Sequence, residues 1–169
     1  MAGLRPIPTP RRAPEWDAAE HKSWQHYLGT ALRMSTLLNA ELLDTHQLSL
    51  ADVQLLDLLD RCPAGRVAMG ELAEALMLLP SRLTRQLKRL EGHGLVQRTV
   101  DPQDRRRVVV TVTDAGRTVV QHALITYANT VRTHFLGPLT RPQIAAMAVT
   151  CRHISDGLKR PGRLGTIKP

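Results

Sequence analysis

The residues of this chain that are best suited to chemistry are arginines, and they gather in one stretch. Between residues 80 and 107, eight arginines and lysines stand against three carboxylates, so this segment carries +5 of the +8 formal charge of the chain. Arginine outnumbers lysine by 19 to 4 overall, and a guanidinium group binds phosphates and guanine edges through paired hydrogen bonds that an ammonium group cannot make. The concentrated charge therefore indicates a nucleic acid as the partner.

The first part of this basic stretch has the spacing of a short helix. Pro80 suits a first helical position, and Gly92 suits the position that follows the last turn. Between them, Leu83, Leu87 and Leu90 recur at intervals of four and three, which predicts one apolar face that packs inward. The arginines of this helix of about three turns are then left on its outer face.

The second part changes to a period of two. Residues 96–100 and 108–112 alternate as two strands do, and the segment DPQDRRR between them combines a proline turn signal with three consecutive arginines. A charge run alone is often only a solvated face, but a basic helix followed by an arginine-tipped hairpin favours contact with DNA. Because aromatic residues make up only 3% of the chain, we expect duplex DNA rather than stacked single strands.

Helices on the N-terminal side must position this basic unit. A helical pattern runs from Trp16 to about His46, and Ser49 with Asp52 resembles a capping box that begins a buried helix. A shorter helix over residues 71–76 precedes the basic one at helix-turn-helix spacing. Residues 1–15 are rich in proline and arginine, which predicts a flexible arm.

Two further helices are expected after the hairpin. Thr113 caps one that runs to about Phe135, and Thr140 with Gln143 makes a second capping box. The last helix carries an apolar seam at spacings of three and four, formed by Ile144, Met147, Cys151, Ile154 and Leu158. Since a monomer of this size would not cover so much apolar helical face, we expect a homodimer with contacts in the regions 16–34 and 135–158.

Composition limits the class of protein. The chain has 169 residues, 43% of them hydrophobic, without an apolar run near 18 residues or a secretory leader, so we expect a cytoplasmic protein. Cys62 and Cys151 are far apart and outside any metal-binding pattern, which argues against a disulfide framework and a zinc site. No catalytic motif stands out, so neither an enzyme nor a cofactor is expected. The predicted divisions are 1–15, 16–48, 49–113, 114–160 and a flexible tail at 161–169.

The wing segment DPQDRRRVVVTVTDAG and the preceding SRLTRQLKRLEGHGLVQR resemble the MarR family of bacterial transcriptional regulators. Asp104 and Arg106 fill the positions of the family's DxR pattern, and Thr113 and Gly116 match its Thr-x-x-Gly helix start. The resemblance implies a mainly α fold with a small β-hairpin wing, a homodimer on a pseudopalindromic operator, and release by a small, often phenolic, ligand or by cysteine oxidation. Leu79 departs from the pattern, because a polar N-cap is expected there.

On this basis we expect a repressor, and the alternative is an architectural or redox-sensing DNA-binding protein without a ligand. The candidate DNA-binding residues are Ser81, Arg82, Thr84, Arg85, Arg89, Arg98, Asp104, Arg105, Arg106 and Arg107. Asp104 is expected to orient a wing guanidinium through an ion pair. The candidate residues for a small anionic aromatic effector are His26, Arg33, Met34 and His46. Their alternative role is that of ordinary exposed, hydrogen-bonded or core residues, and the two cysteines are more simply inert apolar residues than redox sensors.

Overall fold

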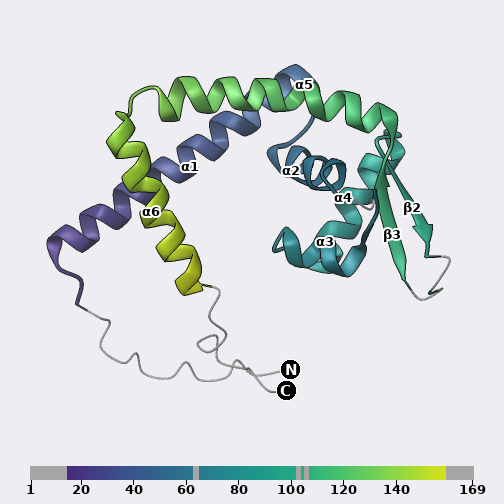
Figure 1. Ribbon diagram of the computed structural model, residues 1–169, viewed down its shortest axis with the longest axis horizontal. Coiled ribbons are helices and arrows are strands. Elements are labelled where there is room, and N and C mark those ends of the chain that lie inside the picture. Colours follow the sequence, from purple (N-terminus) through teal and green to yellow (C-terminus); the bar gives the residue numbers. More distant parts are fainter. Residues whose placement is uncertain (1–14, 63–64, 102–103, 105–106, 159–169) are drawn as a thin grey trace, which may run out of the picture.

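A computed structural model describes residues 15–62, 65–101, 104 and 107–158. The chain forms a compact lobe joined to a pair of long helices that extend away from it (Figure 1). This mainly α fold with a small antiparallel sheet confirms the predicted fold class. In chain order the elements are α1 (Ala18–His46), α2 (Leu50–Asp60), β1 (Val67–Ala68), α3 (Met69–Ala75), α4 (Pro80–Gly92), β2 (Val96–Val100), β3 (Val108–Val112), α5 (Asp114–Val131), the π-helical segment η1 (Arg132–Leu136) and α6 (Arg141–Leu158).

Capping side chains set the start of the first two helices. α1 begins two residues later than predicted, because Asp17 and Glu20 form a capping box in which the Asp17 carboxylate accepts from the Glu20 amide at 2.8 Å. The predicted box at the start of α2 is confirmed. There the Ser49 hydroxyl accepts from the Asp52 amide at 3.2 Å, and the Asp52 carboxylate accepts from the Ser49 amide at 2.9 Å.

The core lies inside the lobe, between α2, α4, the sheet and the start of α5. Leu83, Leu87 and Leu90 of α4 are fully buried, as the sequence predicts, and they share one cluster with Leu55 and Leu56 of α2. Burying each leucine contributes about 1.5–3 kcal/mol relative to leaving it exposed. One face of α4 is therefore fixed to the lobe, and its opposite face is held outward.

The sheet has the order β1–β3–β2, and all of its pairings are antiparallel. The hairpin strands begin and end at the predicted residues, with Val96 opposite Val112 and Val100 opposite Val108. Sequence patterning missed β1, since a strand of two residues has no measurable period. Its Val67 pairs with Val110 and joins the hairpin to the start of α3.

The Thr113-x-x-Gly116 segment fixes α5 to the end of α4. The Thr113 hydroxyl donates to the carbonyl of Gly94 at 2.7 Å and accepts from the Gly116 amide at 3.0 Å. A Cβ atom on Gly116 would lie 2.1 Å from the carbonyl oxygen of Leu95. Only glycine permits this close approach, so the motif has a structural function at the base of the hairpin.

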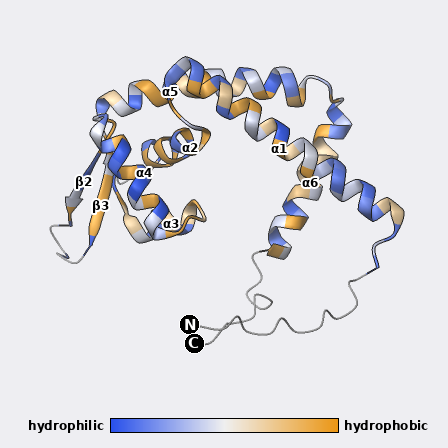
Figure 2. Cartoon of the chain, turned by 180° about the vertical axis from the view of Figure 1, so that it is seen from behind, coloured by the Kyte–Doolittle hydropathy of each residue, from blue (hydrophilic) through white to orange (hydrophobic). Residues whose placement is uncertain are grey.

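α5 leads out of the lobe toward α6. The predicted helix to about Phe135 is continuous in sequence, but it changes to π geometry at Arg132 before the turn at Gly137. The box predicted at Thr140 is half formed: the Gln143 side chain accepts from the Thr140 amide at 2.8 Å, and the Thr140 hydroxyl also donates to it. Apolar residues recur along α6 (Figure 2), yet none of its residues is buried.

Candidate nucleic-acid interface

The outer face of α4 presents cations and short polar side chains. Ser81, Arg82, Thr84 and Arg85 are all exposed, opposite the buried leucines of the same helix. Within the described residues, the side chains of Arg82, Arg85 and Lys88 make no ion pair or hydrogen bond, whereas the Thr84 hydroxyl donates to the carbonyl of Pro80 at 2.8 Å. These three cations are therefore available to a ligand.

A buried carboxylate fixes the orientation of α4. Asp52 at the start of α2 is fully buried, and it accepts hydrogen bonds from the guanidinium of Arg89 and from the side-chain Nε2 of Gln86, the latter at 3.0 Å. Burial by itself would raise the pKa of Asp52, but the hydrogen bonds from Arg89, Ser49 and Gln86 outweigh it and lower that pKa below its usual value. The carboxylate thus stays ionised and holds two side chains of α4.

Arg89, one of the candidate DNA-binding residues, has a carboxylate partner within the lobe. Its guanidinium pairs with Asp52, although the side chain stays 46% exposed. Sequence reasoning placed Asp52 correctly in a capping box but missed its contact with α4. The available signal was the polar Gln86 beside the apolar face of α4, which needs a buried partner.

Two other candidate arginines are also held by carboxylates. The Arg98 Nε donates to Glu91 at 2.9 Å, which connects β2 to the end of α4, and the Arg107 guanidinium donates to Glu71 of α3 at 2.7 Å. Hydrogen bonds from the Arg98 side chain and backbone lower the pKa of Glu91. Arg98 attaches the middle of β2 to α4, and Arg107 attaches the loop end of the hairpin to α3, so both pairs set the direction of the wing.

The tip of the wing lies partly outside the described residues. The predicted ion pair between Asp104 and a wing guanidinium involves Arg105 or Arg106, which lie outside the described residues. The two ends of the loop are described: the Asp101 amide donates to the carbonyl of Arg107 at 2.9 Å, and the Arg107 amide donates to the carbonyl of Asp104 at 2.9 Å. These bonds close the loop that carries the arginines.

The basic residues thus divide into two groups with different roles. Arg89, Arg98 and Arg107 each pair with a carboxylate from another element and brace the lobe. In contrast, Arg82 and Arg85 project from the first turns of α4 without such a partner among the described residues. A helix held at its inner face with unpaired guanidinium groups on its outer face is suited to reading base edges and phosphates.

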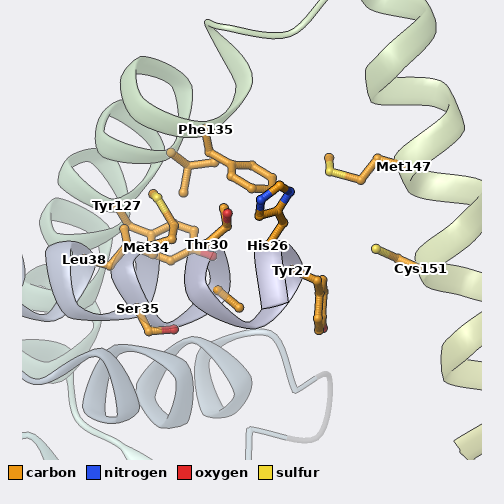
Figure 3. Close-up of a pocket in the computed structure, with 12 residues that line it drawn as sticks. His26, Tyr27, Thr30, Met34, Ser35, Leu38, Tyr127, Phe135, Met147 and Cys151 are labelled. Atoms are coloured by element: carbon orange, nitrogen blue, oxygen red, sulfur yellow. The ribbon is translucent and has the colours of Figure 1, made fainter. Parts of the chain in front are cut away.

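A separate apolar cavity of about 560 Å³ lies between α1, α5, η1 and α6. Figure 3 shows His26 and Met34 of α1 beside Phe135, with Met147 and Cys151 reaching toward them from α6. Two of the four predicted effector residues, His26 and Met34, therefore line one cavity. Its walls are mostly apolar, and the imidazole of His26 is one of the few polar groups.

The other two predicted effector residues lie elsewhere. Arg33 lines a smaller cavity of about 210 Å³ together with His134, and Met34 and Phe135 form part of both cavities. The imidazole of His46 instead bonds the Thr126 hydroxyl of α5 at 2.8 Å. The structure consequently does not bring all four side chains together, because successive positions on one helix face different neighbours.

Three other features of the described residues concern metal binding, cysteine chemistry and membrane insertion. No group of three or more histidine, cysteine or carboxylate side chains in this part of the chain could hold a metal ion. Cys62 is partly buried and Cys151 is exposed, and both are free thiols. No helix in the described ranges is long and apolar enough to cross a membrane.

Comparisons with known proteins agree with this geometry. Residues 48–108 match the model of the MarR family. The structure is similar to Sco3205, a MarR family transcriptional regulator from Streptomyces coelicolor solved in complex with DNA, with 27% identity, a TM-score of 0.82 and coverage of 87% of this chain and 96% of that chain. It is also similar to AbsC, a MarR family transcriptional regulator from the same organism, with 25% identity, a TM-score of 0.80 and coverage of 86% and 98%.

More distant structures share the fold alone, such as the transcriptional regulator BldR from Sulfolobus solfataricus at 24% identity, a TM-score of 0.68 and coverage of 83% of this chain and 99% of that chain. No curated protein sequence matches the chain. The matched segment contains α2 to β2 and the start of β3, which is the lobe whose outer face carries the unpaired arginines. Residues 48–108 of this chain therefore form a MarR family domain.

Proposed function

We propose that this protein is a transcriptional repressor that binds a pseudopalindromic duplex operator as a homodimer and leaves it when a small aromatic anion binds. The observation that carries the proposal is the outer face of α4, where Arg82 and Arg85 are exposed beside Ser81 while Asp52 and the leucine core fix the helix. The DNA complex of the similar regulator Sco3205 supports the same role for this lobe.

The helices outside the lobe support the homodimer. α6 contains 18 residues and buries none of them, and Ile154 and Leu158 are 50% and 81% exposed. On α1, Trp24, Tyr27 and Leu32 are also exposed. A second copy that covers these faces would bring two α4 helices into one assembly, and we propose that each enters a major groove of one half-site.

Arg85→Ala tests whether α4 reads base edges. The operator is first selected from a library of random duplexes with the full-length protein. We expect the substitution to weaken operator binding by about 1–3 kcal/mol in each half-site and to weaken binding to scrambled duplex much less, because a guanidinium that contacts bases carries sequence discrimination. Arg141→Ala is the control, since it removes the same charge at the start of α6, far from the lobe (Figure 1).

Equal losses on operator and scrambled duplex would contradict base reading by Arg85. Lys88→Ala should behave differently, because this exposed cation lies farther along α4, where we propose that it contacts a phosphate and not a base edge. We expect it to weaken both duplexes alike and to reduce the salt dependence of binding by about one unit for each phosphate that the variant no longer neutralises. Titration at several salt concentrations separates the two variants.

The cavity beside α1 is the proposed effector site. A ligand releases DNA only if it binds one dimer geometry more tightly than the other, and this cavity lies between the helix pair α1–α5 and α6, where a change of packing would move the lobes. We expect benzoate and 4-hydroxybenzoate to weaken operator binding, and His26→Ala to weaken this response. His21→Ala is the control, because His21 lies on the same helix but outside the cavity.

Cys151 also lines this cavity, so oxidation of its thiol is the alternative to ligand binding. If oxidants release the operator and Cys151→Ser abolishes that release, the protein is a redox sensor and the ligand proposal is wrong. If neither aromatic anions nor oxidants change operator binding, an architectural role is favoured, and such a protein would discriminate little between operator and random duplex.

A further inference from the structure

Two apolar side chains in the turn that precedes α4 are exposed to solvent. Met77 is 92% exposed and Leu79 is 72% exposed, although Leu78 between them packs against the core of the lobe. All three belong to the short turn between α3 and α4. Of these three residues, only Leu78 contributes an apolar side chain to the packing of the lobe.

The backbone at both exposed positions favours other residue types. Met77 has a φ of 52°, which asparagine and glycine adopt far more readily than methionine. Leu79 occupies the N-cap of α4 and makes no side-chain capping bond, where serine, threonine, aspartate or asparagine would stabilise the helix. The stability of the lobe thus explains neither residue, and positions that break local rules without compensation are expected at functional sites.

The surroundings of this apolar pair identify its partner. The pair precedes Ser81, Arg82 and Arg85, which are exposed on the first turns of the same helix. An apolar protein surface placed here would have to remove water from two unpaired guanidinium groups, which is unfavourable. Duplex DNA pairs those cations with phosphates and base edges, and its major groove also offers an apolar group, the C5-methyl of thymine.

We propose that Met77 and Leu79 are specificity-determining residues that contact thymine C5-methyl groups at the edge of the bases read by α4. This inference rests on the proposed binding of an operator by the lobe. It adds a base preference that the arginines do not supply, because a guanidinium reads guanine whereas an apolar side chain distinguishes thymine from cytosine through the methyl group.

Replacement of single thymines by deoxyuridine tests this contact, because the exchange removes only the methyl group. Each operator thymine is replaced in turn, and the Kd of the full-length protein is measured at one salt concentration. For the wild type we expect at least one position in each half-site where the loss is roughly fourfold, the ratio that corresponds to burial of one methyl group. Leu79→Ser and Met77→Asn should bind the thymine operator more weakly and show no further loss with deoxyuridine at that position.

Thermal unfolding of the same variants separates reading from folding. Leu79→Ser restores a capping hydroxyl and Met77→Asn suits the positive φ, so both should raise the Tm while they lower operator affinity. A purely structural role predicts a lower Tm and equal losses on thymine and deoxyuridine duplexes. Ile125→Ser is the control, since it removes an exposed side chain from α5 instead of from the turn between α3 and α4, and should leave the thymine preference unchanged.

Three results would overturn the inference. The first is an operator in which no deoxyuridine replacement weakens the wild type, and the second is equal deoxyuridine sensitivity in wild type and Leu79→Ser. Both leave operator binding intact, so they reject the methyl contact without rejecting the proposed function. The third is failure to select any preferred duplex, which rejects both.

Discussion

The lobe and α6 follow the same sequence pattern but differ in burial. α4 and α6 both carry apolar residues at spacings of three and four, yet Leu87 and Leu90 are fully buried while Ile154 is 50% exposed and α6 buries no residue. Amphipathic spacing therefore predicts that one face of a helix is buried, but it does not predict whether the same chain or a second chain buries it. In this protein the lobe covers its own faces, and the long helices leave theirs for a second copy, as we propose.

The largest effect that tests this comparison is expected in the core of the lobe. Leu87→Ala should lower the free energy of unfolding by about 2–5 kcal/mol, because it removes buried methyl groups and leaves a cavity. The loss should not depend on protein concentration, since the partners of Leu87 all lie in the same chain. Chemical denaturation at two concentrations measures both points.

Leu32→Ala on α1 is the matched control, because this leucine is 60% exposed. At low protein concentration its loss should stay within about 0.5 kcal/mol. Equal losses for Leu32→Ala and Leu87→Ala in dilute solution would contradict the division between a self-sufficient lobe and uncovered helices.

The second effect concerns the junction between the lobe and α5. Gly116→Ala would place a Cβ atom 2.1 Å from the Leu95 carbonyl oxygen, and this contact is with backbone that cannot rotate away. We expect a loss of about 1–3 kcal/mol in unfolding free energy. Gly92→Ala is the control, because a Cβ atom there meets nothing within 4 Å, so it should be neutral or stabilising. Similar stability of the two variants would mean that the junction relaxes easily.

The third effect depends on pH. Asp52→Asn should cost about 1–2 kcal/mol at neutral pH, because it weakens a capping box and the bond to Arg89. Since the pKa of Asp52 is lowered in the folded protein, its contribution is fully present above the usual value near 3.8 and is lost as the pH falls through the lower folded value. The gap between wild type and variant should therefore narrow in acid. A constant gap from neutral pH to about pH 3 would contradict this assignment.

Prediction from sequence succeeded where structure is local. The strands at 96–100 and 108–112, the Ser49–Asp52 box and the inward leucines of α4 all follow from contacts within a few positions along the chain. Each of these predictions rests on the periodicity of apolar residues or on a helix-capping pair, and the folded structure retains both. The same reasoning placed Ser81, Arg82 and Arg85 on an exposed helical face.

Prediction failed where residues distant in the chain meet. The pairing of Asp52 with Arg89 spans 37 positions, and no local pattern in the sequence indicates it. Likewise, His46 shares α1 with His26, but it faces Thr126 instead of the cavity. Helical periodicity predicts on which face of a helix a residue lies. Which faces enclose a cavity depends on how α1 packs against α5, and periodicity does not predict that packing.

The smallest effect in dilute solution is expected at Ile154, and it tests the other half of the comparison. Ile154→Ala removes a half-exposed side chain from α6, so at nanomolar protein the unfolding free energy should change by no more than about 0.5 kcal/mol. If a second copy covers α6, the same substitution removes a buried contact from the dimer, and its effect must grow as concentration rises, because association stabilises the folded state by mass action. Val100→Ala is the control from the lobe, since Val100 is similarly exposed at 55%. This variant should show the same small change in unfolding free energy at every protein concentration. Sedimentation and thermal unfolding from nanomolar to micromolar protein separate the two variants. Parallel, concentration-independent curves for both would show that the apolar seam of α6 is not the surface that joins two copies.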